Sequence, residues 1–358
     1  MRASLDELTL CQMKKLYSGK YGLVRNIGFF DGFSQLDVCT AQHKYNLGDI
    51  VPMCYMSVSD AKGLIKGGAA SMNPARCKIK SYGEFIERYC ACYFKSNDKA
   101  EENLVTNSLS TGLACGVDFC HASLSGLLEA AERDSFMLTW LYRVPGNRVV
   151  FDGYRNPDLK KLHNHINKHL VGENRLYIYD ISKTAGIYTM LTFIKNDLPS
   201  AYGLIVSAAS HLDPEIALLK SLEELCQGQR YAYQKLYEDK SNIRNIKVEE
   251  IDSVIKHFLY YSNSKHNKNI DFIFANQNET AVLSGMQNYS SGCHKNDYEN
   301  LIENFKAKDI HPLIIDITHP DIKAIGFCAV KCCIPGYIDL MPNAFFEEEK
   351  NKRLQDTD

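Results

Sequence analysis

The stretches SYGEFIERY at residues 81–89 and GLLEAAERD at residues 126–134 decide the fold of this chain. Both contain the cluster Glu-x-x-Glu-Arg, and in both the apolar residues recur every three or four positions, as on one face of a helix. The sequence therefore predicts two helices that carry carboxylates, at about residues 75–94 and 121–141.

The first of these helices has a single apolar face. Its predicted buried stripe consists of Tyr82, Phe85, Ile86 and Tyr89. Glu84, Glu87 and Arg88 fall on the opposite side, and on one helix alone this pattern indicates a solvated face with an i, i+4 Glu–Arg pair.

The second helix is apolar on both sides. One stripe comprises Leu124, Leu127, Leu128 and Ala131, and the opposite ridge continues through Phe136, Met137 and Trp140. We expect such a helix to be buried, so Glu129 and Glu132 must meet cations, because uncompensated buried charges cost several kcal/mol each. Arg133 neutralises only part of this charge.

A third helix is predicted at about residues 213–237, where Asp213 and Pro214 supply an N-cap and a first-turn proline. Its apolar stripe is formed by Leu218, Leu222 and Leu225, and the opposite face carries Lys220, Glu224 and Gln227. The polar faces of the three helices are expected to share one interior.

Clustered carboxylate and amide oxygens suit a hard cation such as Mg2+, which is commonly held by a few carboxylates and nucleotide phosphates. Arg133, Lys220 and Arg230 would pair with phosphate oxygens. The chain has no Walker sequence, so a nucleotide would need a site without a P-loop. A di-iron bundle would need Glu-x-x-His, whereas the third position after each glutamate is Glu, Glu or Gln.

Composition limits the function further. The chain has 358 residues, 45% of them hydrophobic, and its formal charge of -2 gives no reason to expect nucleic acid or an anionic membrane as partner. With no apolar run typical of a signal peptide or a membrane span, we expect a cytoplasmic protein with thirteen free cysteines. The histidines of HNHINKH, residues 163–169, indicate either a solvated helix face or a metal pair.

Extended runs alternate with the helices, which predicts an α+β fold, and two of the runs are expected to form a hairpin over KTAG, residues 183–186. We expect one domain over residues 1–345, in which residues 236–310 are a candidate peripheral lobe. Residues 346–358 form a charged tail.

The chain resembles the YcaO family through KSYGEFIERYCACYF, STGLACGVDFCHASLSGLLEAAERDSFMLTWL, SHLDPEIALLKSLEELCQGQR and VKCCIPG. This resemblance covers about residues 60–340. In detail it is similar to the stand-alone YcaO subunits of microcin-type azole-modified peptide synthetases. It implies a YcaO-like α+β fold in which helices bearing a non-P-loop ATP/Mg2+ site pack on mainly antiparallel sheets.

The resemblance also implies roles for individual residues. The implied metal ligands are Glu84, Glu87, Glu129, Glu132 and Glu224. The implied catalytic residues are Glu129, Glu132 and Arg133. The residues implied in cofactor binding are Lys80, Ser81, Arg88, Ser125, Lys220, Gln227 and Arg230.

By the same resemblance the chain is an ATP-dependent cyclodehydratase subunit of bacteriocin biosynthesis, which forms thiazoline or oxazoline from Cys, Ser or Thr of a ribosomally made precursor peptide. The expected partners are that peptide, a leader-binding partner subunit and a candidate FMN-dependent dehydrogenase, with a homodimer inside a hetero-oligomer.

Two alternatives remain at this point. Val117, Asp118 and His121 occupy positions where the family usually has Asn, Thr and Glu, which is compatible with a non-catalytic YcaO-like scaffold. The chain ends in RLQDTD rather than the proline-rich tail of many azoline-forming members, which is compatible with thioamide or amidine formation.

Overall fold

The computed structural model divides into two compact units. Unit 1 comprises residues 1–32, 53–131 and 289–337, and unit 2 comprises residues 33–52, 132–288 and 338–358. The residues that the structure describes are 5–18, 20, 22–30, 37–40, 43–46, 54–106, 110–170, 175–198, 202–238, 245–275 and 280–341.

The expected single domain over residues 1–345 stays a prediction, and the charged tail 346–358 lies outside the described residues. Of the candidate peripheral lobe, residues 236–288 belong to unit 2 and residues 289–310 to unit 1.

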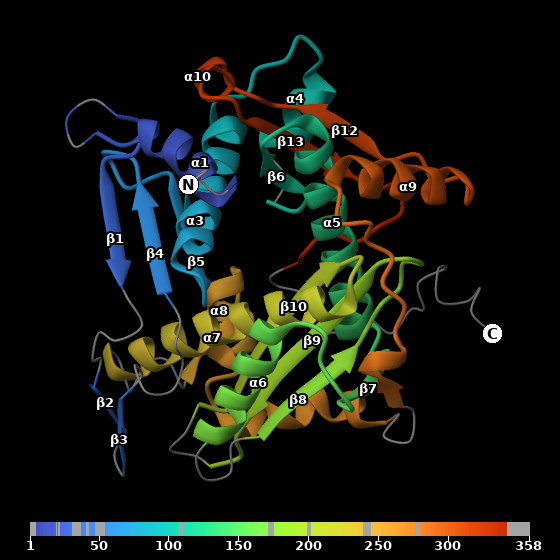
Figure 1. Ribbon diagram of the computed structural model, residues 1–358. Helices are drawn as coiled ribbons and strands as arrows, with labels where there is room; N and C mark the ends of the chain where they lie inside the picture. The colour runs from blue at the N-terminus through green and yellow to red at the C-terminus, as the bar shows by residue number, and fades with distance from the viewer. Residues whose placement is uncertain are drawn as a thin grey trace. The chain divides into compact units, whose positions relative to one another are not determined.

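Unit 1 contains two three-stranded antiparallel sheets (Figure 1). The first has the order β1 (Asn26–Phe30), β4 (Cys54–Ser59) and β5 (Lys66–Ser71). The second has the order β12 (Leu313–Asp316), β13 (Cys328–Cys333) and β6 (Leu113–Gly116). Its helices are α1 (Leu5–Met13), η1 (Lys14–Leu16), α3 (Pro74–Tyr93), α4 (Lys99–Thr106), α9 (His294–Lys306) and α10 (Pro320–Ala324).

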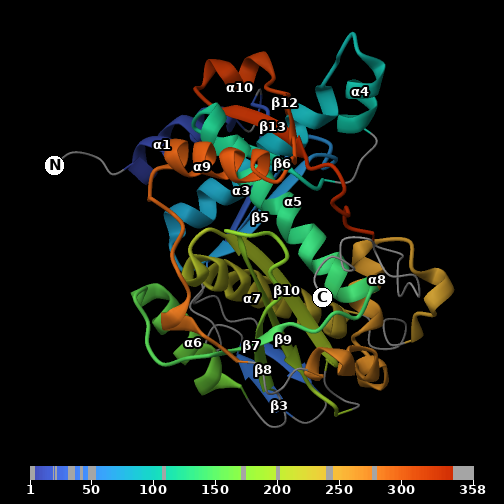
Figure 2. The same cartoon turned by 90° about the vertical axis from the view of Figure 1, so that its right-hand side faces the viewer.

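Unit 2 is built on a five-stranded sheet, against which α7 packs along two neighbouring strands (Figure 2). The strand order is β10 (Leu204–His211), β9 (Tyr188–Lys195), β8 (Arg175–Asp180), β7 (Asn147–Val150) and β11 (Thr280–Val282). A separate two-stranded ladder joins β2 (Asp37–Thr40) and β3 (His43–Asn46). The helices are α6 (Pro157–His169), α7 (Pro214–Glu238), η3 (Val248–Glu250), α8 (Val254–Tyr260), η4 (Ser264–Phe274) and η5 (Leu283–Gly285).

Helix α5 (Phe119–Leu141) contributes to both units, because the boundary falls between Ala131 and Glu132. The three predicted helices are confirmed as α3, α5 and α7. The mainly antiparallel α+β architecture is also confirmed, since every described strand pair except β11 with β7 is antiparallel. The hairpin over KTAG is the β8–β9 pair.

Local sequence explains where α3 and α7 begin. Asn73 caps α3 by accepting hydrogen bonds from the amides of Ala75 and Arg76, and Pro74 follows it. Asp213 acts in the same way at α7, where its Oδ1 accepts from the amide of Glu215 at 2.8 Å. A side-chain cap followed by proline satisfies free amides and presets the first helical φ angle.

Burial follows the predicted stripes. The α3 stripe of Tyr82, Phe85, Ile86 and Tyr89 lies in the core of unit 1, and α3 packs across β4 and β5 (Figure 1). Gly67 of β5 permits this close approach, because a Cβ there would lie 2.2 Å from the Ser81 carbonyl oxygen. In α5 the residues Leu124, Leu127, Leu128, Ala131, Met137 and Trp140 are buried, which confirms a helix that is buried on both sides.

The cysteines that the structure describes are free thiols, as expected. Within the same described residues, no helix is both long enough and apolar enough to cross a membrane.

Replacing Leu128 by Ala should lower the free energy of unfolding by roughly 2–5 kcal/mol, because the side chain is 5% exposed and its loss leaves a cavity. Leu64→Ala is the matched control, since Leu64 is 78% exposed and its truncation should change stability by less than about 0.5 kcal/mol. Chemical denaturation of both variants measures the difference, and equal losses would show that Leu128 is not a core residue.

Candidate functional site

Unit 1 holds the carboxylates of α3 against neighbouring strands. Glu84 Oε2 accepts a hydrogen bond from the Gly68 amide of β5 at 2.5 Å, while Glu84 Oε1 pairs with Arg88 one turn later. Arg88 also donates to the Lys66 carbonyl at 2.7 Å. The i, i+4 pair predicted from the sequence is therefore present, and although Arg88 is exposed the pair is also bonded to β5.

Glu87 lies on the other flank of α3, where its Oε1 accepts from the Cys115 amide of β6 at 3.0 Å. Burial, together with repulsion from Glu129 and Glu84, raises the pKa of Glu87 to about 8. Three predicted metal ligands from α3 and α5 are thus near enough to oppose one another's ionisation.

These carboxylates suit a hard cation. Within the described residues, no group of three or more His, Cys, Asp or Glu side chains is arranged as a metal site. Mg2+ usually takes only one or two protein carboxylates and completes its shell with water and phosphate oxygens. A divalent cation beside Glu87 and Glu129 would offset the burial and the repulsion that together raise the pKa of Glu87.

Unit 2 holds the next pair of predicted residues on α5. Glu132 is only 8% exposed, and its Oε2 accepts from the Ser210 amide of β10 at 3.1 Å. Its Oε1 lies 3.2 Å from Nη1 of Arg133. The sequence expectation that this buried carboxylate meets a cation is confirmed by that ion pair.

The predicted residues of α7 follow one another along the helix. Glu224 is exposed and accepts from the Ser207 hydroxyl of β10 at 3.4 Å, whereas Lys220, Gln227 and Arg230 are half-buried. Their spacing of three or four residues aligns them along α7.

The remaining candidates belong to unit 1. Ser81 is fully buried, and its hydroxyl donates to the carbonyls of Met56 and Cys77 at 3.1 and 2.9 Å. Lys80 and Ser125 are half-buried. The candidates that belong to unit 1 are Lys80, Ser81, Glu84, Glu87, Arg88, Ser125 and Glu129, and those that belong to unit 2 are Glu132, Arg133, Lys220, Glu224, Gln227 and Arg230. Their roles in binding ATP and metal stay predictions.

The residues that depart from the family pattern interact with one another in unit 1. Asp118 caps the start of α5 by accepting from the His121 amide at 2.8 Å, and the Val117 amide lies 3.4 Å from His121 Nδ1. The His121 ring stacks on His294 of α9, with centroids 3.9 Å apart. Of these departures, His121 therefore contacts α9, while Asp118 caps the start of α5.

Sequence analysis missed Lys331 of β13, which is 1% exposed and donates to the Thr111 carbonyl at 2.7 Å. Cys332 next to it donates its amide to the Gly112 carbonyl at 2.8 Å. Together they fix the turn before β6, the strand that presents the Cys115 amide to Glu87. A lysine flanked by apolar residues in VKCCIPG was the available signal.

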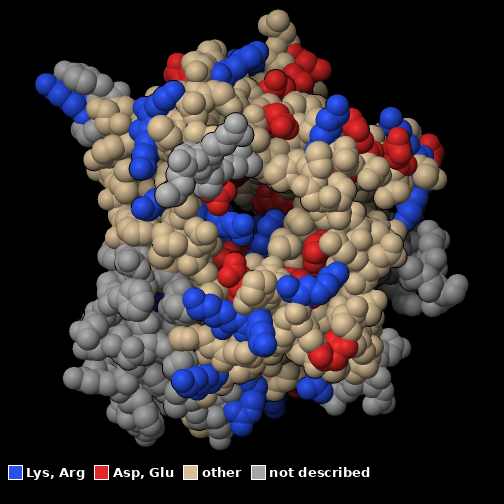
Figure 3. All heavy atoms as spheres, viewed as in Figure 1, with Lys and Arg blue, Asp and Glu red and all other residues tan. Residues whose placement is uncertain are grey.

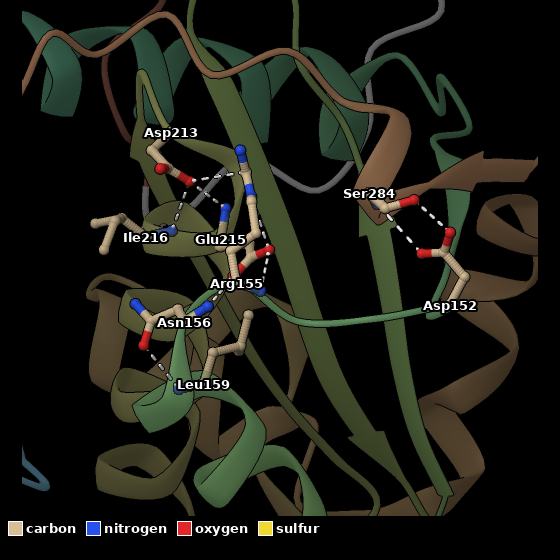
Figure 4. A network of polar contacts seen from close by, with 8 residues as sticks. All are labelled: Asp152, Arg155, Asn156, Leu159, Asp213, Glu215, Ile216 and Ser284. Carbon is tan, nitrogen blue, oxygen red and sulfur yellow. Dashed lines mark hydrogen bonds and ion pairs between the residues drawn. The ribbon is translucent and has the colours of Figure 1, made fainter.

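Glu215 of α7 was also missed, and it is 2% exposed (Figure 4). Its carboxylate accepts from the amides of Arg155 and Asn156 and from Nε of Arg155 at 2.6 to 3.1 Å. Arg155 also lies 3.6 Å from the Asp213 carboxylate. This network ties the start of α7 to the start of α6, and nearby Ser284 bonds separately to Asp152 (Figure 4).

The two histidines of α6 at i, i+4 spacing are His165 and His169, and the side chain of His169 lies outside the described residues, so a metal pair there stays a prediction. The third histidine, His163, is bonded within the protein. His163 Nδ1 lies 2.5 Å from the Tyr154 hydroxyl, and its Nε2 lies 3.0 Å from Nδ2 of Asn167. Both ring nitrogens are therefore engaged by protein groups, and burial lowers the pKa of His163 to about 4.

Figure 3 shows Lys and Arg interspersed with Asp and Glu on the face in view, in keeping with the small formal charge.

A protein-family model matches more than half of this chain. The model described as "YcaO cyclodehydratase, ATP- and Mg2+-binding" matches residues 91–338. An uncharacterized protein of Methanothermobacter thermautotrophicus is 23% identical over 250 residues, which cover 69% of this chain and 57% of that protein. The chain thus spans little more than half the length of this curated relative.

Three solved structures have a similar fold. YcaO from Methanopyrus kandleri, bound with AMPPCP and Mg2+, gives a TM-score of 0.69 at 15% identity, covering 98% of this chain and 97% of that one. A heterocyclase in complex with substrate and cofactor gives 0.67 at 16% identity, covering 94% of this chain but 53% of that one. The E. coli microcin synthetase McbBCD complex with pro-MccB17 bound gives 0.54 at 12% identity, covering 85% and 92%. The predicted fold is thereby confirmed.

Glu87→Gln should stabilise the protein without nucleotide or Mg2+, because the amide keeps the bond from Cys115 and removes the repulsion. The pKa of Glu87 in the folded protein is about 8, above the ordinary 4.5. Glu87 therefore does not lower the free energy of unfolding of the wild type below pH 4.5, and it lowers that free energy most above pH 8. The variant should therefore gain about 1 kcal/mol or more at pH 8.5 and almost nothing at pH 4.5.

Thermal unfolding at both pH values measures this gain, with Glu303→Gln as control because Glu303 is exposed on α9. A Glu87→Gln variant that is less stable at pH 8.5 would contradict the carboxylate cluster.

His163 should make the protein less stable in mild acid. The pKa of His163 in the folded protein is about 4, below the ordinary 6.5. Its contribution to the free energy of unfolding is therefore fully present above pH 6.5 and is lost as the pH falls toward 4. The loss should be roughly 1–3 kcal/mol. Chemical denaturation between pH 7 and 4 measures how the free energy of unfolding falls with pH. The fall should be smaller in His163→Asn than in the wild type. His311→Asn is the control and should behave like the wild type, because the His311 side chain is exposed.

Proposed function

The chain belongs to the YcaO family of ATP-dependent enzymes, and from that premise we propose that it forms thiazoline or oxazoline rings in a ribosomally made peptide. ATP and Mg2+ are the cofactors of the family to which it belongs. The observation that carries the proposal is the Glu87 carboxyl, whose pKa is raised by burial and then by the charges of Glu129 and Glu84, so that a bound cation would stabilise its ionised form.

The proposed reaction needs no covalent enzyme nucleophile. A Cys thiol or a Ser or Thr hydroxyl of the peptide attacks the preceding amide carbonyl carbon and loses its proton, which closes the ring, and the carbonyl oxygen receives the γ-phosphoryl group of ATP. Phosphate then leaves with that oxygen, the former amide nitrogen loses its proton, and a C=N bond forms within the ring. The peptide loses one water and ATP becomes ADP and phosphate.

The task of the protein in this reaction is positioning and charge neutralisation. We propose Glu84, Glu87, Glu129, Glu132 and Glu224 as metal ligands. Mg2+, when bound, would neutralise phosphate charge. Arg133 and Glu132 would act at the transferring group, and the residues proposed to bind the nucleotide are Lys80, Ser81, Arg88, Ser125, Lys220, Gln227 and Arg230.

The proposed setting is a cytoplasmic modification complex of the microcin type. The likeness to the McbBCD complex, which holds pro-MccB17, supports a precursor peptide as substrate. We propose that a partner subunit captures the leader of that peptide, that this chain forms a homodimer within the complex, and that an FMN-dependent dehydrogenase oxidises the azoline to an azole.

Mass spectrometry of the co-encoded precursor peptide tests the reaction, after incubation with this protein, its partners, Mg2+ and ATP. We expect the loss of one water per modified residue, and the further loss of two hydrogens where a dehydrogenase acts. Exchange of oxygen for sulfur would replace the proposal by thioamide formation. An unchanged mass with no ATP consumed would identify a non-catalytic scaffold.

Glu129→Gln and Glu132→Gln should each abolish ATP-dependent modification, with a loss of at least about 100-fold in rate, because shape is kept and charge is removed. The measurement is ADP release coupled to peptide mass, with circular dichroism to verify the fold. Glu303→Gln in unit 1 and Glu249→Gln in unit 2 are matched controls on exposed glutamates. Full activity in either test variant would remove that glutamate from the proposed ligands.

A further inference from the structure

Two Thr–Ser pairs cross the central hairpin of unit 2. In the antiparallel register of β9 and β10, Thr189 lies opposite Ser210 and Thr192 lies opposite Ser207. Residues three apart on a strand point to opposite faces, so the sheet carries one hydroxyl pair on each face. Both threonines and Ser210 are at most 3% exposed, and Ser207 is half-buried.

The first pair contacts α5. Thr189 Oγ1 lies 2.7 Å from Ser210 Oγ and 3.3 Å from Ser135 Oγ. Ser135 is one helical turn after Glu132, and the amide of the same Ser210 donates to Glu132 Oε2 at 3.1 Å. The Thr189–Ser210 pair thus contacts α5 at Ser135. Glu132 lies one turn earlier, and its carboxylate accepts a hydrogen bond from the backbone amide of Ser210.

In the second pair the two hydroxyls bond separately to residues of α7. Thr192 Oγ1 lies 2.8 Å from Ser221 Oγ, which also donates to the Ser207 carbonyl at 3.3 Å. Ser207 donates its hydroxyl to Glu224 Oε2 at 3.4 Å, and Ser221 precedes Glu224 by one turn. Each helix therefore presents a serine and a glutamate, three residues apart, to one Thr–Ser pair.

The hydroxyls at these positions are hydrogen-bonded, so burying them leaves no unpaired polar group. Their hydrogen bonds also fix direction and distance, because a hydrogen bond tolerates little change in either. The four residues thus set the helical register at which Glu132 and Glu224 meet β10.

We propose that Ser207, Thr189 and Ser210 are positioning residues that hold Glu224 and Glu132 for binding of magnesium and ATP. This inference rests on the proposed use of ATP by this chain and not on which peptide product is formed. The three residues act through the two carboxylates and have no contact with substrate in this account.

Ser207 gives the cleaner test because it is half-buried and its loss should leave the fold intact. Isothermal titration with Mg2+ and the analogue AMPPCP measures binding without turnover. Ser207→Ala should weaken binding about 3- to 10-fold, as expected for one ordinary hydrogen bond, and Ser207→Thr should restore it. Ser284→Ala is the matched control, because its hydroxyl bonds Asp152 of the same unit.

Thr189→Val and Thr189→Ser extend the test to the buried pair, with the melting temperature measured alongside. A positioning role predicts that Thr189→Val weakens analogue binding and that Thr189→Ser restores it. The melting temperature should stay within a few degrees of the wild type. If both Ser207→Ala and Thr189→Val bind as tightly as wild type, the hydroxyls are structural and the inference is wrong. A wild-type protein that fails to bind the analogue overturns the proposed function and this inference together.

Discussion

The burial of the Glu87 carboxyl beside Glu129 and Glu84 is the constraint on which the candidate site of unit 1 depends. Burial first, and the two neighbouring charges second, raise the pKa of Glu87 to about 8, so ionising this group lowers the stability of the native state. Such an arrangement is typical of sites in which a bound cation completes the charge balance.

Backbone amides of the strands next to the helices orient the glutamate carboxylates by hydrogen bonds. The Gly68 amide of β5 binds Glu84, the Cys115 amide of β6 binds Glu87, and the Ser210 amide of β10 binds Glu132. A strand amide is a fixed donor, because its direction is set by the sheet and not by a side-chain rotamer. In each unit, helices supply the carboxylates and strand backbone sets their orientation, which is how an α+β fold can prepare a site before its ligand arrives.

The sequence predicted those parts of the fold that depend on residues close together along the chain. Helices α3 and α7 begin with a capping side chain and proline, and their apolar stripes recur at helical spacing, so both were found. Lys331 and Thr111 are far apart in sequence, as are Glu215 and Arg155, and no periodic pattern connects them. The hydroxyls of Thr189 and Thr192 were also missed, because threonine in a strand run indicates only extended structure.

Location of the metal ion tests the central claim most directly. The measurement is anomalous scattering from Mn2+, substituted for Mg2+, in crystals of the protein grown with AMPPCP, because Mn2+ prefers the same oxygen ligands. We predict an anomalous peak with a carboxylate oxygen of Glu87 or Glu129 in its coordination shell. A bound nucleotide whose metal contacts none of the predicted glutamates would contradict it.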